Sequence, residues 1–359
     1  MVVHLCCGVD AGYFLKRLKE EFPEERLIGY FFDPNIHPYS EFLLRSFETK
    51  RVCEKLGVEF VEGEYLVEEW FQQVKGLEQE PEKGERCSRC FDFSLEKSAL
   101  LARQLGERRV TTSLLMSPMK SREQLKRVGE VLREKYQVEL LTPDFRKKGG
   151  TQAQQQLARE WELYRQDYCG CLFGLRKQKG EESLKELSSP VGGELTPASP
   201  EERLHLYQLR RWLEERRIPH RVIREEFLNY RLLRGGVEKG GKGVVPSFIL
   251  PYSQLPRPVR GEVEFFKNGV GYFSKMGALL VELERFNQIG GFQFKSVSQL
   301  YRHPPSFEKQ LDIRRKLEKR SYSTSPIFIL DRVEMGIRYR LEVESLLFPD
   351  HQFHLLLNL

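Results

Sequence analysis

The stretch His4-Leu5-Cys6-Cys7-Gly8-Val9-Asp10, near the start of the chain, decides the fold of the region around it. The apolar run over residues 1–5 leads into it and predicts a β-strand. Apolar residues then recur every fourth position over residues 11–22, which predicts an amphipathic helix. A strand, a tight turn and a helix place the thiols of Cys6 and Cys7 at the carboxyl end of the strand. In an open parallel α/β sheet, ligands bind at that edge.

Two adjacent cysteines at this position allow two interpretations. Neighbouring thiols seldom form a disulfide with each other, because the ring that links them is strained, but they can hold two atoms of one metal site. The backbone N–H groups of the following helix would stabilise their thiolates. Alternatively, both side chains are small buried hydrophobic groups at the end of a strand. The stretch alone favours neither interpretation.

Strands and helices continue to alternate through the first half of the chain. Short β-forming runs are predicted at residues 27–32, 58–61, 109–114 and 138–141, and helices at 40–56, 65–74, 91–105, 121–136 and 151–166. This order predicts an α/β fold in which helices cover a parallel sheet. Three close cysteine pairs fall at the ends of predicted elements, where loops from distant parts of the chain converge.

The length of the chain allows two domains without requiring them, and the composition of one segment marks a linker between them. Residues 189–200 contain three prolines and two glycines, which predicts a linker. We therefore expect residues 1–188 to form a metal-binding catalytic domain, because they hold every cysteine. Residues 201–359 would form a C-terminal α+β domain. It begins with a charged helix over 201–217 and contains a hairpin signal at Lys267-Asn268-Gly269.

The composition limits the class of protein and its compartment. The chain has 359 residues, of which 40% are hydrophobic and 31% charged, with a net charge of +6. This mildly basic balance permits a nucleic-acid partner. No apolar run approaches the roughly 20 residues that cross a membrane, and the N-terminus lacks the pattern of a signal peptide. We therefore expect a cytoplasmic protein without a membrane partner.

Six of the seven cysteines form three close pairs: Cys6-Cys7, Cys87-x-x-Cys90 and Cys169-x-Cys171. In a cytoplasmic protein such clusters favour metal or redox chemistry over structural disulfides. A C-x-x-C pair beside other thiols is typical of zinc and of iron–sulfur sites, and the spacing does not separate the two. Cys53 stands alone in an apolar helical pattern and is expected to be buried and inert.

The pairs could divide their work between two sites. Four thiolates suffice for one [4Fe–4S] cluster, and the first two pairs would supply them: Cys6, Cys7, Cys87 and Cys90. Cys169 and Cys171 would then form a reversible disulfide or hold a second metal. Asp10 follows Cys7 by about one helical turn and would add an oxygen ligand.

Five patterns occur in a specific order, although each alone is weak. They are His4-x-Cys6-Cys7; Pro34-Asn35-Ile36-His37-Pro38; Arg86-Cys87-x-x-Cys90-Phe91; Thr111-Thr112-Ser113-Leu114 with Ser117-Pro118; and Tyr164-Arg165-Gln166-Asp167-Tyr168-Cys169-Gly170-Cys171-x-Phe173. Together they resemble the epoxyqueuosine reductases of the QueH type, which are independent of cobalamin. The resemblance covers about residues 1–175, half of the chain. Departures from the family pattern at Gly8, Asp33, Phe91 and Gly174 leave every paired cysteine in place.

The resemblance implies a Rossmann-like fold of the nucleotide-hydrolase kind, with helices on both faces of a parallel sheet. It implies an oxidoreductase of tRNA processing that reduces epoxyqueuosine to queuosine at the wobble position, in queuosine biosynthesis. The implied cofactors are a [4Fe–4S] cluster and an adjacent mononuclear iron or other divalent metal. The partners would be the tRNA that carries epoxyqueuosine in its anticodon, and an external electron donor. Residues 201–359 lie outside the resemblance, but we expect them to help to bind that tRNA, because Arg210, Arg211, Arg216 and Arg217 crowd one predicted helix.

The resemblance also implies roles for individual residues. The cluster ligands would be Cys6, Cys7, Cys87 and Cys90. Catalytic residues that hold the second metal would be Asp10, Cys169 and Cys171; alternatively, the last two would form a redox-active disulfide. Residues expected to contact the substrate are Asn35, His37, Tyr164, Arg165 and Tyr168. For each of these five, an ordinary structural role in its loop or helix is the alternative.

Two other classes of protein stay open. An ATP-pyrophosphatase-type tRNA-modifying enzyme begins with the same fold but needs a Ser-Gly-Gly-type loop after the first strand, where this chain has His-Leu-Cys-Cys-Gly. A zinc-stabilised RNA-binding protein without catalysis would also use these cysteines. Residues 236–243 resemble a P-loop, but Gly243 stands where Ser or Thr would bind magnesium, so we expect a basic loop there.

Overall fold

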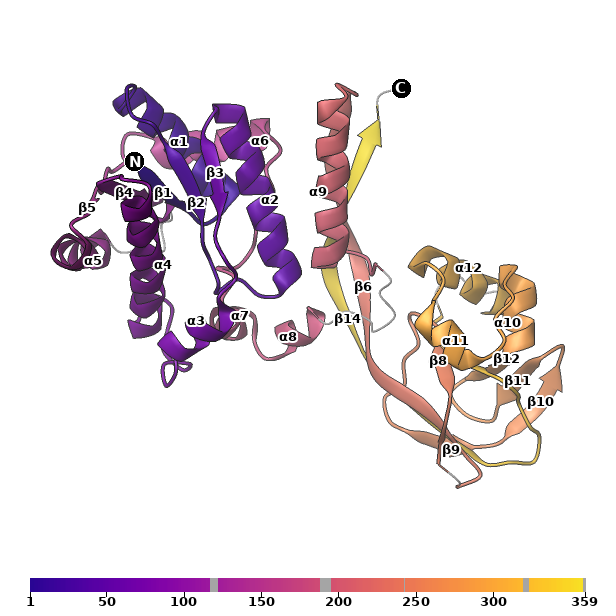
Figure 1. Cartoon of the computed structure of the whole chain (residues 1–359). Coiled ribbons are helices and arrows are strands. Elements are labelled where there is room, and N and C mark those ends of the chain that lie inside the picture. The colour runs from indigo at the N-terminus through magenta and orange to yellow at the C-terminus, as the bar shows by residue number, and fades with distance from the viewer. Residues whose placement is uncertain (117–121, 188–194, 242, 319–322, 358–359) are drawn as a thin grey trace. The chain divides into compact units, whose positions relative to one another are not determined.

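The structure is a computed structural model that describes residues 1–116, 122–187, 195–241, 243–318 and 323–357. Contacts within the chain divide it into two compact units. The first unit holds residues 1–184 and 203–222 with Leu357, and the second holds residues 185–202 and 223–356. Figure 1 colours the chain from indigo at its N-terminus to yellow at its C-terminus.

The first unit is built on a five-stranded sheet in the order β3-β2-β1-β4-β5, in which all neighbouring strands are parallel. Its strands are β1 (Val2–Leu5), β2 (Ile28–Phe31), β3 (Glu59–Glu62), β4 (Arg109–Thr112) and β5 (Glu139–Leu140). The predicted parallel sheet is therefore confirmed. The chain runs from β1 towards β2 and β3, then returns on the other side of β1 to β4 and β5. At such a switch point a crevice opens outside the carboxyl ends of the strands.

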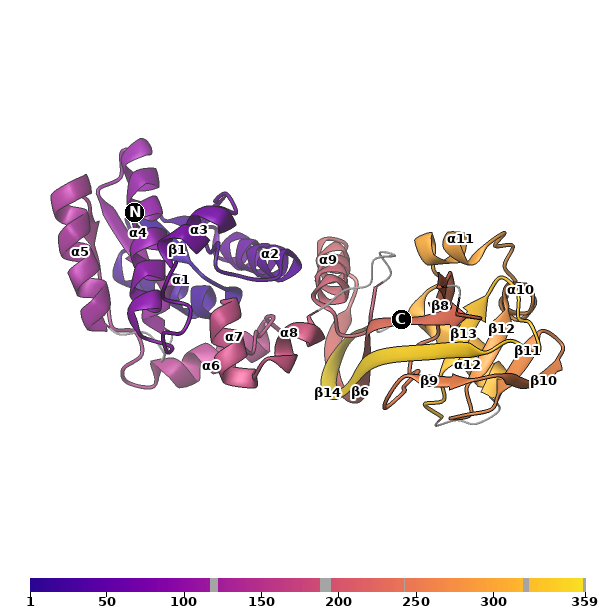
Figure 2. The ribbon, with the colours of Figure 1, turned by 90° about the horizontal axis from the view of Figure 1, so that it is seen from below.

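Helices cover both faces of this sheet, as Figures 1 and 2 show. They are α1 (Gly8–Glu21), α2 (Tyr39–Leu56), α3 (Val67–Gln73), α4 (Glu85–Gln104), α5 (Arg122–Tyr136), α6 (Gly150–Glu160), α7 (Leu172–Lys179) and α8 (Glu182–Glu186), with a 3-10 turn over Ser113–Met116. Helix α1 packs against α2 and α6, whereas α4 packs against α3 and α5. The Rossmann-like architecture is thereby confirmed. The turn expected at Ser117-Pro118 lies outside the described residues.

The central strand β1 is buried along its whole length, and its one polar side chain finds partners on both sides. His4 is fully buried, with Nδ1 2.9 Å from Thr112 Oγ1 on β4 and Nε2 3.1 Å from the carbonyl oxygen of Phe32 after β2. A buried polar group left without a partner would destabilise the fold by about 1–3 kcal/mol. These contacts fix β1 between its neighbours just before Cys6 and Cys7.

The helix predicted over residues 91–105 begins earlier, because its first turn is tied to the loop before it. Helix α4 starts at Glu85, so Cys87 and Cys90 lie inside its first two turns. Arg86 is 1% exposed and donates hydrogen bonds to the carbonyl oxygens of Glu78 and Glu80. This charged segment has no hydrophobic period, so the sequence pattern could not reveal the extra turn.

The helix predicted over residues 151–166 is shorter than expected. Helix α6 ends at Glu160, and Glu162 has a φ of 47°, which a right-handed helix does not allow. Residues 161–171 therefore form an irregular connection between α6 and α7. This connection carries the last cysteine pair, which is held by contacts to other parts of the first unit.

Most of helix α9 (Pro200–Glu215) belongs to the first unit, which includes residues 203–222. Its Arg210 is fully buried, with a guanidinium nitrogen 2.7 Å from the carboxylate of Glu48, which is 1% exposed. Removing one partner of a buried ion pair destabilises a fold strongly, because it leaves the other charge uncompensated. The boundary between the two units therefore differs from the one expected at residue 201. The division into a catalytic domain and a C-terminal domain remains a proposal.

The second unit contains two further sheets, in the orders β10-β11-β12-β13-β8 and β7-β6-β14-β9. Its elements are β6 (His220–Lys239), β7 (Val244–Val245), β8 (Ser247–Ile249), β9 (Val259–Gly261), β10 (Val263–Lys267), β11 (Val270–Phe273), β12 (Leu279–Glu282), β13 (Ile327–Leu330), β14 (Tyr339–Leu357), α10 (Leu283–Gly290), α11 (Val297–Arg302) and α12 (Phe307–Glu318). The predicted hairpin is confirmed: Asn268 and Gly269, with φ of 51° and 75°, join β10 to β11. Where a P-loop needs a helix, β6 is followed by its antiparallel partner β7.

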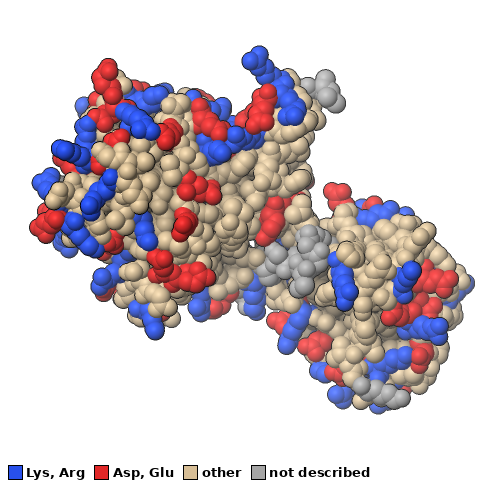
Figure 3. Space-filling view, viewed as in Figure 1, with Lys and Arg blue, Asp and Glu red and all other residues tan. Residues whose placement is uncertain are grey.

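The surface carries both signs of charge. Figure 3 shows lysines and arginines interspersed with aspartates and glutamates over the face that it draws. The net charge of +6 is thus not gathered into a single basic patch on this face. Of the helices in the described ranges, none combines the length and the hydropathy that crossing a membrane requires.

Candidate metal centre and active site

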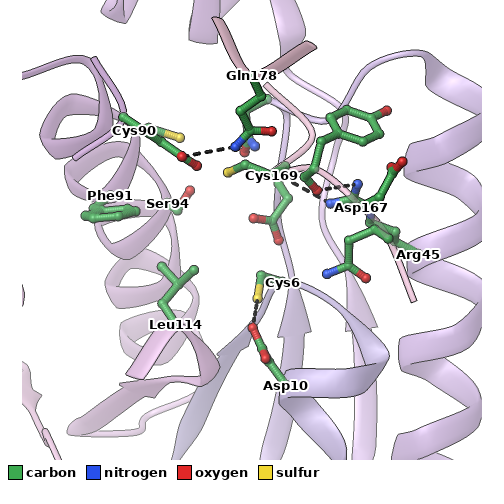
Figure 4. A pocket seen from close by; sticks show the side chains of 15 residues that line it. Cys6, Asp10, Arg45, Cys90, Phe91, Ser94, Leu114, Asp167, Cys169 and Gln178 are labelled. Carbon is green, nitrogen blue, oxygen red and sulfur yellow. Dashed lines mark hydrogen bonds between the residues drawn. The ribbon is translucent and has the colours of Figure 1, made fainter. Parts of the chain in front are cut away.

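A cavity of about 290 Å³ lies at the carboxyl edge of the first sheet. Residues that follow three different strands line it: Cys6 after β1, Asp33 after β2 and Leu114 after β4. One cysteine of each predicted pair also reaches it, namely Cys6, Cys90 and Cys169 (Figure 4). The three pairs, which are far apart in sequence, therefore converge on one cavity at the switch point of the sheet.

The first pair and Asp10 form a compact group of possible metal ligands. A sulfur atom of each of Cys6 and Cys7 and a carboxylate oxygen of Asp10 lie within 4.8 Å of one another. The two sulfur atoms are 4.0 Å apart, and Cys6 Sγ is 3.5 Å from Asp10 Oδ2. Two thiolates and a carboxylate at this separation can hold one metal ion between them.

The local fold explains why these side chains face each other. Cys7 is the N-cap of α1, and its sulfur accepts a hydrogen bond from the backbone N–H of Asp10 at 3.5 Å. The backbone N–H of Cys6 donates to Ser113 Oγ at 3.2 Å, which ties the end of β1 to the turn after β4. The hydrogen bond with Cys7, burial and nearby carboxylates raise the pKa of the Cys6 thiol well above its ordinary value. A bound cation would stabilise the thiolate form of Cys6, which these surroundings otherwise disfavour.

The second pair lies on α4 and receives N–H donors at sulfur. The indole Nε1 of Trp70 donates to Cys90 Sγ at 3.3 Å, and the backbone N–H of Lys83 donates to Cys87 Sγ at 3.3 Å. Hydrogen bonds to the sulfur ligands tune the potential of iron–sulfur clusters. Cys90 lines the cavity, and Cys87 lies one turn earlier on the same helix.

The third pair sits on a loop that is docked against the loop after β2. The backbone N–H of His37 donates to the carbonyl oxygen of Gly170 at 2.9 Å. Gly170 has a φ of 103°, and a Cβ on it would lie 2.8 Å from Cγ1 of Ile36. Only glycine fits both the backbone conformation and the close approach. This contact turns Cys169 towards the cavity and places Cys171 at the start of α7.

A buried ion pair on α2 supports the same loop, and the sequence analysis did not identify it. Arg45 is 2% exposed and lies 2.7 Å from the carboxylate of Glu41. Its other nitrogens donate to the backbone carbonyl oxygens of Tyr168 and Cys169, both at 3.1 Å. The signal in the sequence was a Glu and an Arg four residues apart beside the apolar positions of a helix.

Two of the residues expected to contact substrate lie on the loop after β2, and the described residues that line the cavity include Asn35 but not His37. Asn35 lines the cavity and is 4% exposed, and its Oδ1 has no hydrogen-bond partner among the described residues. His37 Nδ1 is 2.7 Å from the carbonyl oxygen of Asn35, and burial lowers its pKa. Gln166, which the sequence analysis passed over although it lies within a quoted pattern, also lines the cavity; within the described chain, its buried Oε1 has no partner either.

The other three expected substrate contacts differ in position. Tyr168 lines the cavity, and its hydroxyl donates to the carbonyl oxygen of His37. Arg165 is exposed. Tyr164 is 3% exposed, and its hydroxyl donates to Glu41 at 2.8 Å. Tyr164 therefore completes the packing around the ion pair of α2, where no base could stack on it without a rearrangement.

The comparisons with known proteins show the family to which this chain belongs. Residues 1–177 match the family model described as epoxyqueuosine reductase QueH. The epoxyqueuosine reductase QueH of Helicobacter pylori is 36% identical over 99% of this chain and 100% of its own length. The chain belongs to the QueH family of epoxyqueuosine reductases. It is therefore an oxidoreductase of the class associated with queuosine biosynthesis.

Other QueH proteins match only the first half of the chain. The QueH of Thermotoga maritima is 35% identical over 54% of this chain and 97% of its own length. The QueH of Histophilus somni is 36% identical over 49% of this chain and 72% of its own length. The alignment with the Helicobacter pylori protein therefore spans nearly the whole chain, whereas the other two alignments span about half of it.

A solved structure, the U34-tRNA thiolase NcsA from Methanococcus maripaludis with its [4Fe-4S] cluster, covers 59% of this chain and 72% of its own at a TM-score of 0.33 and 14% identity. This likeness is too low to bear on the cofactor of a QueH protein. The donor set itself is informative: cysteine sulfur atoms from three elements line one cavity, and N–H groups donate to Cys90 and to its neighbour Cys87 on α4. Such a set fits an iron–sulfur cluster or a thiolate-bound metal ion.

Proposed function

We propose that this cavity reduces epoxyqueuosine to queuosine at the wobble position of tRNA. The observation that carries the proposal is the convergence of Cys6, Cys90 and Cys169, one from each pair, on a cavity at the switch point of the sheet. Family membership supports it, because QueH relatives carry the name epoxyqueuosine reductase.

The reaction removes one oxygen atom from a carbon ring. Two electrons and two protons convert the epoxide into an alkene, and the oxygen leaves as water. We propose that Cys6, Cys7, Cys87 and Cys90 hold a [4Fe–4S] cluster, with a mononuclear metal beside it on Asp10, Cys169 and Cys171. Bound there, these groups would supply single electrons and polarise the epoxide oxygen. The competing role of Cys169 and Cys171 is a redox-active disulfide.

The residues of the chain itself would select and orient the ring. The cavity volume of about 290 Å³ lies at the lower limit of small-molecule pockets. It therefore suits the ring that bears the epoxide better than a whole modified nucleoside. The side-chain amides of Asn35 and Gln166 would bind hydroxyl groups of that ring, because each presents a buried oxygen without a partner among the described residues.

Contacts to the rest of the tRNA would come from surfaces around the cavity and from the second unit. Arg165 is exposed next to the loop that carries Cys169, and Tyr168 lines the cavity. We propose that residues 1–188 are the catalytic domain and that the region after the linker 189–200 adds tRNA contacts. Arg210 would not take part, because it is fully buried. The electron donor would be an external cytoplasmic protein or thiol.

The test uses full-length protein purified without oxygen. We expect a brown protein with the absorption and EPR spectra of a [4Fe–4S] cluster, which converts epoxyqueuosine to queuosine in isolated tRNA when a reductant is supplied. Nucleoside analysis of the tRNA by mass spectrometry follows the reaction. A colourless protein that holds zinc alone and leaves epoxyqueuosine unchanged would contradict the proposal and favour an RNA-binding role.

A further inference from the structure

A glutamine outside the cysteine patterns makes a direct contact with the candidate metal ligands. Gln154 lies on α6, 144 residues away from Asp10 in the chain, and its Nε2 donates to Asp10 Oδ1 at 2.6 Å. The other carboxylate oxygen of Asp10, Oδ2, lies 3.5 Å from Cys6 Sγ. The two oxygens of one carboxylate therefore have separate partners, an amide on one side and a thiol on the other.

The position of Gln154 is one where packing alone would favour an apolar residue. The buried residues of α6 are Gly150, Gln154, Leu157 and Ala158, and this face packs against α1. Gln154 is 4% exposed. Burying an amide is unfavourable unless it is hydrogen-bonded. Its hydrogen bond to a carboxylate compensates for the burial, and bonds to charged acceptors are stronger than those between neutral groups.

We propose that Gln154 is a positioning residue for the metal centre, which acts by fixing the rotamer of Asp10. The amide holds Oδ1 and thereby turns Oδ2 towards the sulfur atoms of Cys6 and Cys7. The inference rests on the proposed function, because it concerns the mononuclear metal that Asp10 would hold beside the cluster on Cys6 and Cys7. Removing a group that hydrogen-bonds to a metal ligand and orients it commonly weakens metal binding about 10–100-fold.

The test measures metal affinity in the full-length protein rather than turnover. Protein purified without oxygen and stripped of iron is titrated with Co²⁺, and the absorption from thiolate to cobalt is followed. We expect Gln154→Leu to weaken Co²⁺ binding by about 10-fold or more. Gln156→Leu is the control, because Gln156 lies on the same helix, is exposed and donates to Glu160 in an exposed pair. The Co²⁺ affinity of the Gln156→Leu variant should stay within about twofold of that of the wild type.

A double-mutant cycle separates positioning from a general packing effect. If Gln154 acts through Asp10, Gln154→Leu should have no further effect on Co²⁺ affinity once Asp10→Asn is present. Additive losses would overturn the proposal, as would wild-type affinity in Gln154→Leu. Gln154→Met, of similar length and without a donor, should reproduce the loss and covers the case in which the leucine variant does not fold.

The outcomes also separate this inference from the proposed function. If Asp10→Asn and Cys6→Ser weaken Co²⁺ binding while Gln154→Leu does not, only the role of Gln154 fails. If none of the three changes affects Co²⁺ binding, the metal site on Asp10 is itself refuted. Loss of epoxyqueuosine reduction with normal Co²⁺ binding in Gln154→Leu would contradict a positioning role and give the residue a direct role in catalysis.

Discussion

The guanidinium of Arg45 donates a hydrogen bond of 3.1 Å to the carbonyl oxygen of Cys169, 124 residues further along the chain. A buried side chain of α2 thereby holds the backbone of the loop that brings the third cysteine pair to the cavity. Glu41, which is 1% exposed, pairs with Arg45, so the two charges depend on each other. The arrangement of the active site is therefore coupled to the stability of the first unit.

Replacing Arg45 should destabilise the first unit and loosen the cysteine loop. Arg45→Met leaves the carboxylate of Glu41 buried and uncompensated, which we expect to reduce the free energy of unfolding by about 3–5 kcal/mol. Urea unfolding followed by tryptophan fluorescence measures it, because Trp70, Trp161 and Trp212 all lie in the first unit. Arg17→Met removes an exposed pair and should change the free energy by about 0.5 kcal/mol or less. Equal effects of the two substitutions would contradict this account.

The cysteines should differ sharply in their effect on iron content. Cys87→Ser and Cys90→Ser should each lose most of the iron and sulfide, because each would remove a cluster ligand. Cys53→Ser should keep both: Cys53 is fully buried, as predicted, and burial raises the pKa of its thiol to about 12. Iron and acid-labile sulfide per chain, measured on protein purified without oxygen, check this. Full iron content in the Cys90→Ser variant would show that the ligand assignment is wrong.

The third pair should matter for turnover more than for the cluster. Burial raises the pKa of the Cys171 thiol, and Cys169 lines the cavity. We expect Cys171→Ser to keep the cluster spectrum but to stop conversion of epoxyqueuosine. Iron and thiols are then counted in wild type and variant: loss of one iron per chain indicates a metal ligand, whereas unchanged iron with a lost pair of redox-active thiols indicates a disulfide. Normal turnover by this variant would exclude both roles.

Stability of the first unit should fall as pH drops, in part because of His37. Burial lowers the pKa of His37 below its ordinary value of 6.5, so the unfolded chain binds a proton at higher pH than the folded one. The stabilisation is thus complete above pH 6.5 and is lost as pH falls through this value towards the folded pKa. His37→Gln should flatten the dependence of the unfolding free energy between about pH 7 and pH 5, as judged by urea unfolding at each pH.

His205 is a suitable control for this titration, because it is exposed and lies in the first unit. His205→Gln should leave the slope of wild type unchanged. A slope in His37→Gln that matches wild type would show that other groups dominate the acid sensitivity.

Much of the first unit could be predicted from the sequence, because its determinants are local. The alternation of short apolar runs with helical periods specifies a parallel sheet, and it places the three cysteine pairs near the ends of its elements. The hairpin at Asn268-Gly269 follows equally from local turn chemistry. The ordered motifs also identified the family, since each cysteine pair is preceded or followed by distinctive neighbours.

Only the tertiary structure decided which side chains meet. The sequence could not show that Cys6, Cys90 and Cys169 face the cavity, since the direction of a thiol depends on how its helix or loop packs. The spacing of Glu41 and Arg45 is visible in the sequence but their burial is not, because charged residues normally lie at the surface. The buried pair of Arg210 with Glu48 was hidden altogether. Contacts between residues more than a hundred positions apart arise from burial shared by several elements, and no local pattern in the chain records them.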